Sequence, residues 1–197
     1  MTKRRNKTTP IPKPRQYKHV ATLPLHDKHT WTAPEGYKIL MVDRGLVSFN
    51  LPADWYIHAM DPFDIRDKAP PDETCHLQAT LYRAPAGVDW SGLPLISLME
   101  KVIQGAYKDI LERSPIQKHP RTDIEIVWFQ QRFIDKEEKR PAFSRIAMAR
   151  GQTVHVLFTF DYWVDDAAKL EPVWEEVMRS VMLDRTIADP IRGETLH

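Results

Sequence analysis

The side chains that could do chemistry in this sequence gather on two segments with the pattern of β-strands. Residues 75–82 and 153–162 alternate between apolar and polar side chains, as a strand with one buried face does. The polar positions carry imidazole, amide, hydroxyl and carboxylate groups, namely His76, Gln78, Thr80 and Tyr82 on the first segment and His155, Thr159 and Asp161 on the second. If the two strands are neighbours, these residues form one polar patch.

Such a patch allows two interpretations. Convergent polar groups in an apolar surround can bind a small molecule, and Trp128, Tyr162 and Trp163 could supply that surround. The alternative, which we favour, is an ordinary solvated sheet face, because antiparallel sheets often leave one face in water. The candidate ligand-binding residues under the first interpretation are His76, Gln78, Thr80, Tyr82, His155 and Asp161.

Cys75 and His76 are adjacent, which suggests a nucleophile and its base. Neighbouring residues on a strand point to opposite faces, so this imidazole cannot reach this thiol. Cys75 falls on the same face as Leu77 and Leu81, where a thiol packs as a small apolar group. We therefore predict an inert core cysteine, because reactive thiols need an exposed, electropositive setting.

Catalytic, cofactor and metal motifs are absent from the sequence. It contains no G-x-x-x-x-G-K-[ST], G-x-G-x-x-G, G-x-S-x-G or H-E-x-x-H. His19, His26 and His29 are the best metal-ligand candidates, but their segment has the composition of a loop and no second cluster accompanies it. Asp165-Asp166 and Glu137-Glu138 suggest a helix cap and a solvated turn. We expect no catalytic residue, no metal and no cofactor.

Charge is distributed unevenly along the 197 residues. The chain has 28 basic and 27 acidic residues, and seven basic ones precede the first acid, Asp27, so the rest is net acidic. This proline-punctuated start predicts a disordered or extended tail. It could hold phosphates, anionic lipid or an acidic partner. The alternative, which we favour, is a solubilising tail or one that folds back on the acidic body. The candidate anion-binding residues are Lys3, Arg4, Arg5, Lys7, Lys13, Arg15 and Lys18.

Extended segments are predicted in both halves of the chain. Their apolar residues alternate or run continuously between turn residues such as Asp43-Arg44-Gly45 and Arg150-Gly151-Gln152, which suit tight hairpins. The expected strands are 37–42, 47–51, 55–60, 75–82, 124–134, 143–149 and 153–162.

Two amphipathic helices are predicted between and after these strands. The first has apolar residues three or four apart from Ile96 through Met99 to Ile110, and we expect Ser114-Pro115 to end it. The second opens at Asp165 or Asp166 and carries the apolar stripe Leu170, Val173, Trp174, Val177 and Val181.

This order of elements predicts an α+β fold, a largely antiparallel sheet sandwiched by two main helices. Hairpins too short for crossover connections require antiparallel pairing, and both helical stripes must be buried against the sheet. We expect residues 1–22 to be a basic flexible tail, 23–186 a single domain and 187–197 a C-terminal tail. One cysteine rules out a disulfide scaffold, and no run of about 20 apolar residues predicts a membrane span. With no signal peptide expected, we predict a cytoplasmic protein.

A short motif carries a resemblance to a known family. Phe49-Asn50-Leu51-Pro52-Ala53-Asp54-Trp55 resembles the strand-turn that opens domains of the PsbP-like superfamily, which includes the Mog-type import factors and small bacterial proteins. The hairpin 143–162, the acidic gap and the last helix with Ser180 near its end are also similar, so the resemblance spans about residues 46–183. It implies an α/β/α sandwich and a non-enzymatic binding or assembly role, and it transfers no site residue.

Three functions remain open, in order of preference. The first is a non-catalytic module that binds a protein partner or helps assemble a complex. The second is a small-molecule-binding protein or hydrolase that uses His76, His155 and Asp161. The third is a tether to an anionic polymer or membrane surface through the basic tail. We do not expect nucleic acid as the partner, because aromatic stacking residues are not interleaved in the tail. A homodimer formed through an open sheet edge is an alternative that the sequence leaves untested.

Overall fold

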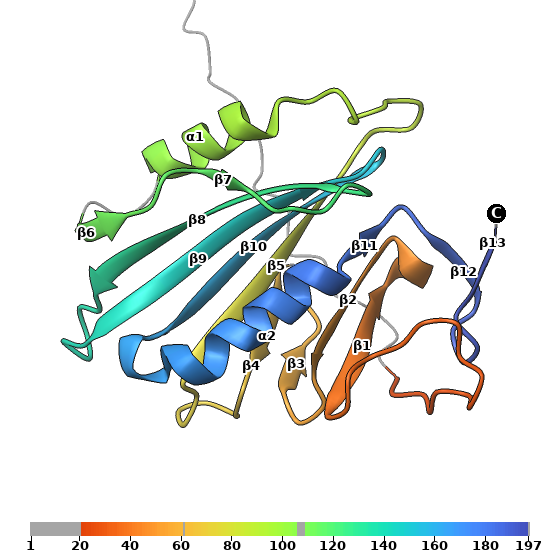
Figure 1. The fold of residues 1–197 in the computed structure, drawn as a ribbon, viewed down its shortest axis with the longest axis horizontal. Helices are drawn as coiled ribbons and strands as arrows, with labels where there is room; N and C mark the ends of the chain where they lie inside the picture. Colours follow the sequence, from red (N-terminus) through yellow and green to blue (C-terminus); the bar gives the residue numbers. More distant parts are fainter. Residues whose placement is uncertain (1–20, 61, 106–108, 197) are drawn as a thin grey trace, which may run out of the picture.

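A computed structural model describes residues 21–60, 62–105 and 109–196, and it contains two α-helices within a largely β-stranded body (Figure 1). The helices are α1 (Leu95–Gly105) and α2 (Ala167–Ser180). The strands are β1 (Tyr37–Val42), β2 (Val47–Pro52), β3 (Tyr56–His58), β4 (Phe63–Arg66), β5 (Cys75–Arg83), β6 (Ile110–Arg113), β7 (Gln117–Lys118), β8 (Glu125–Ile134), β9 (Pro141–Arg150), β10 (Val154–Trp163), β11 (Met182–Leu183), β12 (Thr186–Asp189) and β13 (Glu194–Leu196).

The main sheet has eight strands, in the order β3-β4-β5-β10-β9-β8-β6, with β7 paired to β8 beside that path. Every pairing in it is antiparallel. The long strands β8, β9 and β10 follow one another through short turns, as the sequence predicts. The predicted fold class is therefore confirmed, an antiparallel sheet with a main helix on each face.

One face of this sheet is covered by α2 together with a small second sheet. Strands β1, β2 and β11 form that sheet, and the predicted hairpin at Asp43-Arg44-Gly45 joins β1 to β2. Gly45 has a φ of +96°, and a side chain there would collide with Ile187 of β12. Only glycine therefore suits both the backbone angle and the close approach.

The covered face holds the larger core. The alternating side chains of β5 and β10 point into it, including Leu77, Phe158 and Phe160, all at most 1% exposed. Trp174 of α2 stacks on Phe160, with ring centroids 6.1 Å apart and planes 3° from parallel. The helix begins at Ala167 without a side-chain cap from Asp166, and Pro172 lies inside it. The expected aspartate cap is thus not formed, and Asp165 instead pairs with Arg140 at 3.0 Å.

The opposite face is covered only in part. Helix α1 packs against β8 and β9, where a second, smaller core includes Leu95, Met99, Val127, Phe129 and Ile146. Helix α1 lies beyond β7 and β8, away from β4 and β5 (Figure 1). On this face, the start of β5 at Cys75 and the end of β10 at Trp163 therefore have no helix above them.

The structure corrects the boundary predicted for the first helix. The described helix ends at Gly105, and Ile110 belongs to β6, which pairs with β8. Leu95 is buried while Ile96 is 42% exposed, so the buried stripe begins at Leu95, and Met99 belongs to it as predicted. An apolar residue at helical spacing serves equally well in an edge strand, which explains the error. Ala106, which the same spacing places in the predicted stripe, lies outside the described residues.

The structure describes the C-terminal segment up to residue 196 but not residues 1–20. Strands β12 and β13 form a hairpin, and Ile187 is 5% exposed, which differs from the tail expected at 187–197. The backbone N–H of His26 donates to Ile191 O at 3.0 Å, so this hairpin contacts the start of the described chain. The candidate anion-binding residues Lys3, Arg4, Arg5, Lys7, Lys13, Arg15 and Lys18 lie outside the described residues. None of the described helices is long and apolar enough to span a membrane.

Candidate functional site

Strands β5 and β10 are neighbours, as the polar patch requires. Their antiparallel register places Asp161 opposite His76, Thr159 opposite Gln78, and His155 opposite Tyr82. The expectation that the two strands share one polar face is confirmed. The environment along that face nevertheless changes from one end to the other.

His155 lies at the closed end of the face. It is 4% exposed, and the ring of Trp90 packs edge-on against it, with centroids 4.9 Å apart. Burial lowers the pKa of His155 below its ordinary value. Covered in this way, His155 is not among the residues that line the cavity described below.

The middle of the face is a solvated strip. Gln78 and Thr80 are partly exposed, and Tyr82 is 46% exposed. None of these three side chains lines the cavity. Their arrangement matches the solvated sheet face that the sequence analysis favours for the whole patch.

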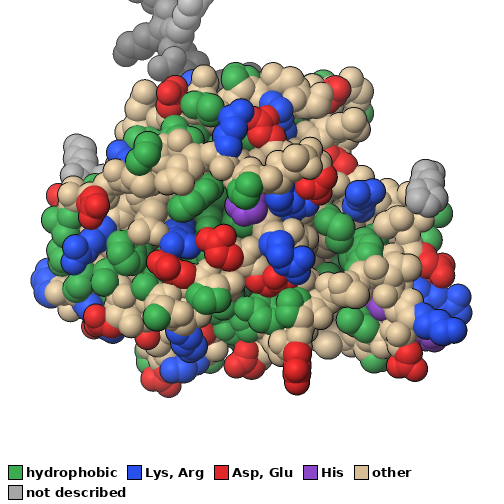
Figure 2. Space-filling view, viewed as in Figure 1, with side chains coloured by type: hydrophobic (Ala, Val, Ile, Leu, Met, Phe, Trp, Pro, Cys, Tyr) green, Lys and Arg blue, Asp and Glu red, His purple; other side chains and the backbone are tan. Residues whose placement is uncertain are grey.

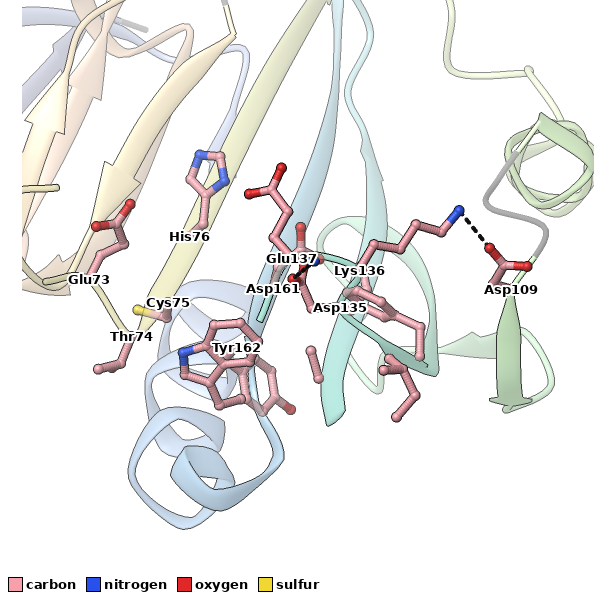
Figure 3. A pocket seen from close by; sticks show the side chains of 15 residues that line it. Glu73, Thr74, Cys75, His76, Asp109, Asp135, Lys136, Glu137, Asp161 and Tyr162 are labelled. Atoms are coloured by element: carbon pink, nitrogen blue, oxygen red, sulfur yellow. Dashed lines mark hydrogen bonds and ion pairs between the residues drawn. The ribbon is translucent and has the colours of Figure 1, made fainter. Parts of the chain in front are cut away.

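A cavity of about 340 Å³ opens at the other end, where α1 does not reach. Figure 3 shows Glu73, Cys75 and His76 on one side of it, Lys136 and Asp109 on the other, and Glu137 and Asp161 between them. The volume is near the lower end of the roughly 300–1,000 Å³ typical of ligand pockets. We call this cavity the sheet-end pocket. Its lining residues are Glu73, Thr74, Cys75, His76, Asp109, Phe133, Ile134, Asp135, Lys136, Glu137, Ala142, Ser144, Asp161, Tyr162 and Trp163.

Asp161 is the most deeply placed carboxylate of the sheet-end pocket. Burial raises its pKa above the ordinary value, and hydrogen bonding from Ser144 and the nearby imidazole of His76 offset this only in part. Its Oδ1 atom is buried and has no hydrogen-bond partner among the described residues. A buried acceptor without a partner costs about 1–3 kcal/mol. A ligand that donates a hydrogen bond to Asp161 would offset this cost.

His76 is held by a residue that the sequence analysis does not identify. Its Nε2 atom lies 2.8 Å from Oδ1 of Asp64, which is on β4, a strand that the sequence analysis does not predict. Arg66 of the same strand donates to Asp64 at 2.9 Å and also pairs with Glu73. Burial opposes ionisation of Asp64, but Arg66 and His76 outweigh it, so its pKa is below the ordinary value. A two-residue alternation of Asp64 and Arg66 around Ile65 is the signal that could have located β4.

The rim of the pocket is rich in charge. Lys136 pairs with Asp109 at 2.7 Å. The carboxylate of Asp135 accepts hydrogen bonds from the backbone N–H groups of Glu137 and Glu138, so this loop is the solvated turn that the sequence predicts. The guanidinium of Arg140 lies 5.0 Å from the ring centroid of Trp163.

The pocket does not present a paired nucleophile and base. Cys75 is 3% exposed, and burial raises the pKa of its thiol far above the ordinary value, so it stays a thiol rather than a thiolate. Ser144 hydrogen-bonds the carboxylate of Asp161, and the imidazole of His76 is engaged by Asp64. Over the described residues, no three His, Cys, Asp or Glu side chains are grouped to hold a metal ion.

A second cavity, of about 280 Å³, lies beside β2 and the end of α2. Arg121 in its wall donates to the carbonyl oxygens of Met178 and Val181 and to Asp123. Arg179 is paired with Glu176 at 2.6 Å. These two guanidinium groups are already matched by acceptors of the chain itself, so we assign them to fixing the end of α2.

The face that carries α2 is chemically mixed. Figure 2 shows acidic and basic side chains interspersed over it, with apolar side chains between them. Single apolar residues scattered in this way are ordinary for a protein surface.

Comparison with known proteins gives the family of the chain. Residues 38–187 match the family model Alr1449. The chain belongs to the Alr1449 family. It is 41% identical over 174 residues to "Uncharacterized protein alr1449" of Nostoc sp. (strain PCC 7120 / SAG 25.82 / UTEX 2576), covering 87% of this chain and 90% of that protein. The matched range includes all the residues of the sheet-end pocket.

Solved structures share the fold of this Alr1449-family chain at low identity. The solution structure of cyanobacterial PsbP (CyanoP) from Synechocystis sp. PCC 6803 superposes with a TM-score of 0.51 and 11% identity, over 77% of this chain and 95% of CyanoP. A crystal structure from Bacteroides thetaiotaomicron VPI-5482 gives a TM-score of 0.55 and 14% identity, over 76% of this chain and about half (49%) of that one. The PsbP-like resemblance is thus confirmed for the fold.

Proposed function

We propose that this chain is a non-catalytic binding domain that recognises a protein partner at the sheet-end pocket. The observation that carries the proposal is Asp161, whose buried Oδ1 atom lacks a partner within the described chain although the carboxylate lines an open cavity. A fold seldom keeps a buried acceptor unsatisfied without a functional reason. A donor from outside the chain would remove this cost.

The chemistry of the lining supports binding rather than catalysis. The thiol of Cys75 is buried, and neither Ser144 nor His76 is free to act on the other, because each is engaged by a carboxylate. Nucleophilic catalysis needs a nucleophile within hydrogen-bond reach of its base. Apolar side chains, among them Phe133 and Trp163, instead give the pocket walls that suit a docked side chain.

A pair of matched variants tests where the partner binds. Ile134 lines the pocket and is 40% exposed, whereas Ile96 lies on α1, outside the pocket, and is 42% exposed. We expect a stoichiometric partner to co-purify with the tagged chain, Ile134→Trp to reduce its recovery at least tenfold, and Ile96→Trp to leave it within twofold. Equal recovery with the two variants would exclude the pocket as the contact.

A small-molecule ligand is the second candidate function, and the cavity around His76 and Asp161 is what favours it. Of the candidate ligand-binding residues, only these two line the pocket, so Gln78, Thr80, Tyr82 and His155 have no direct part in this version of the proposal. Thermal stabilisation of the wild-type chain by a metabolite, lost in Ile134→Trp and kept in Ile96→Trp, would support it over a protein partner.

Two further expectations from the sequence remain proposals. The tail from Lys3 to Lys18 would give salt-sensitive binding to an anionic polymer or membrane surface, and deletion of residues 1–18 would abolish it. Retention of binding after that deletion would refute the tether. We also keep the cytoplasm as the proposed compartment, with localisation of a fluorescent fusion as its test.

A further inference from the structure

We propose that the sheet-end pocket recognises an organic cation on an aliphatic stem, the end of a lysine or arginine side chain of the partner. This inference rests on the proposed function, because it names the chemistry that the same pocket takes. It makes the pocket an acceptor site, in which carboxylate oxygens meet donor N–H groups and the walls of the cavity meet the methylene groups.

The acceptors come from two carboxylates that line the cavity, Asp161 and Glu73. Oδ1 of Asp161 and Oε2 of Glu73 are both buried without a hydrogen-bond partner among the described residues. The other oxygen of Glu73 is paired with Arg66, which keeps that side chain in place. An ammonium has three donors and a guanidinium five, so a cationic group that donates to one of these oxygens keeps further donors for other acceptors.

The charge around the pocket favours a cation. Five lining residues are acidic, and the basic ones are Lys136 and His76. Lys136 is matched by Asp109, whereas Asp135 and Glu137 form no ion pair within the described part of the chain. The rim already attracts one cation of the chain itself, since Arg140 lies over the ring of Trp163. An anionic ligand would meet net repulsion here.

The shape and the lining of the pocket favour an aliphatic stem behind the charge. Phe133, Ile134, Ala142 and Trp163 contribute apolar lining beside the carboxylates. Lysine and arginine bury their methylene stems along apolar surface while the charged end finds polar partners. A bare metal ion would leave these walls unused, and no group of metal-ligating side chains is present over the described residues.

The test uses the full-length ¹⁵N-labelled chain and two probes that differ only in the charged group. These are Nα-acetyl-L-lysine methylamide and Nα-acetyl-L-norleucine methylamide, titrated into ¹H–¹⁵N correlation spectra. We expect saturable shifts confined to amides at 73–76, 142–144 and 161–163 with the lysine probe, and at least tenfold weaker binding of the norleucine probe. Equal affinity for the two probes would overturn cation recognition.

Variants locate the cation in the pocket. Asp161→Asn should weaken binding of the lysine probe at least tenfold, because a hydrogen bond to a charged group contributes about 1.5–3 kcal/mol. Glu138→Gln changes a solvent-exposed carboxylate outside the pocket and should stay within twofold. Unchanged binding in Asp161→Asn would refute the site.

A surface variant keeps the test independent of changes at the buried carboxylate. Ile134→Lys places an ammonium group of the chain itself at the rim, so it should weaken binding of the lysine probe at least tenfold. Ile96→Lys places the same group on α1 and should not weaken that binding. Loss of probe binding in both variants, or in neither, would overturn the proposal.

A comparison of the tripeptide acetyl-Gly-Lys-Gly-amide with n-butylamine then identifies whether the cation belongs to a peptide or to a free amine. Tighter binding of the peptide supports a protein partner, and equal binding makes a free amine the ligand.

The outcomes for the two proposals are separable. If Ile134→Trp abolishes partner recovery while the two norleucine and lysine probes bind alike, the partner site stands and its cationic chemistry is wrong. If the lysine probe binds as expected and partner recovery is unchanged in Ile134→Trp, the pocket binds cations and the partner contacts another surface.

Discussion

The two faces of the main sheet are covered to different extents. On one face, α2 and the small sheet bury one continuous core that includes Phe49, Phe158, Phe160 and Trp174. On the other, α1 buries a smaller core over β8 and β9 and stops short of the ends of β5 and β10. The same strands therefore carry structural side chains on one face and accessible polar chemistry on the other.

This difference shows that the placement of one helix, α1, over part of the sheet leaves a site open beside it. Asp161 and Phe160 are consecutive residues of β10, yet Phe160 is 1% exposed in the core and Asp161 lines a pocket. The alternation of a strand guarantees that they face opposite ways. The incomplete cover by α1 is what leaves one of those two faces reachable by a ligand.

The largest effect should come from Trp174→Ala on the fully covered face. Trp174 is 1% exposed and stacks on Phe160, so its removal leaves a large cavity in the main core. We expect the free energy of unfolding to fall by about 3–5 kcal/mol. Urea denaturation followed by circular dichroism measures it.

Met99→Ala on the partly covered face should cost less, about 2 kcal/mol, at the lower end of the range for such truncations. Met99 is fully buried, but the cluster under α1 is smaller than that under α2. The same urea series gives the comparison. A loss in Met99→Ala equal to or above that in Trp174→Ala would contradict the ranking of the two faces.

Asp161→Asn should raise the free energy of unfolding at pH 7, because the variant replaces a carboxylate whose charged form is disfavoured by burial with a neutral amide. The pKa of Asp161 is raised in the folded chain, so the folded state holds this proton to higher pH than the unfolded state does. The stability of the wild-type chain therefore falls as pH rises through that interval.

The amide of the variant does not titrate, which fixes the sign of the comparison. The stability advantage of Asp161→Asn over wild type should be near zero at pH 4 and largest at pH 7. Thermal melting of both proteins from pH 4 to pH 7 measures this. An advantage that grows toward pH 4 would show that Asp161 is stabilised as the carboxylate.

The smallest effect concerns Cys75, which points into the fully covered face. Burial raises the pKa of its thiol, so the native chain should give no reaction with a disulfide reagent at pH 8 over minutes. The chain unfolded in urea should release one equivalent. Fast labelling of the native chain would mean that the cover on this face opens readily.

The long strands were predictable because their signal is local. In β10, Val154, Val156, Phe158, Phe160 and Tyr162 alternate without interruption, and all five are buried. The short strands β4 and β6 were missed, since a segment of four residues gives a periodicity too brief to separate from a loop or a helix end. Helix α1 was over-extended to Ile110 for the same reason.

The candidate site was predictable only in part. The alternation placed His76 and Asp161 on one face, and their strands are in fact neighbours. The same reasoning grouped His155 with them, although Trp90 from a distant loop covers it. It also missed Asp64, which contacts His76, and it did not place Glu73 or the loop at Asp135–Glu137 at the pocket, because these residues meet through contacts between segments far apart in the chain.

The sequence by itself determined which side chains of each long strand share a face, and the antiparallel connection of the three consecutive long strands. Both follow from the two-residue period of a strand and from turns too short for a crossover. The tertiary structure alone decided that Ile110 belongs to a strand, which part of the sheet α1 covers and that Asp161 has an oxygen without a partner among the described residues beside an open pocket. Those outcomes depend on packing between segments distant in sequence, which no local pattern encodes.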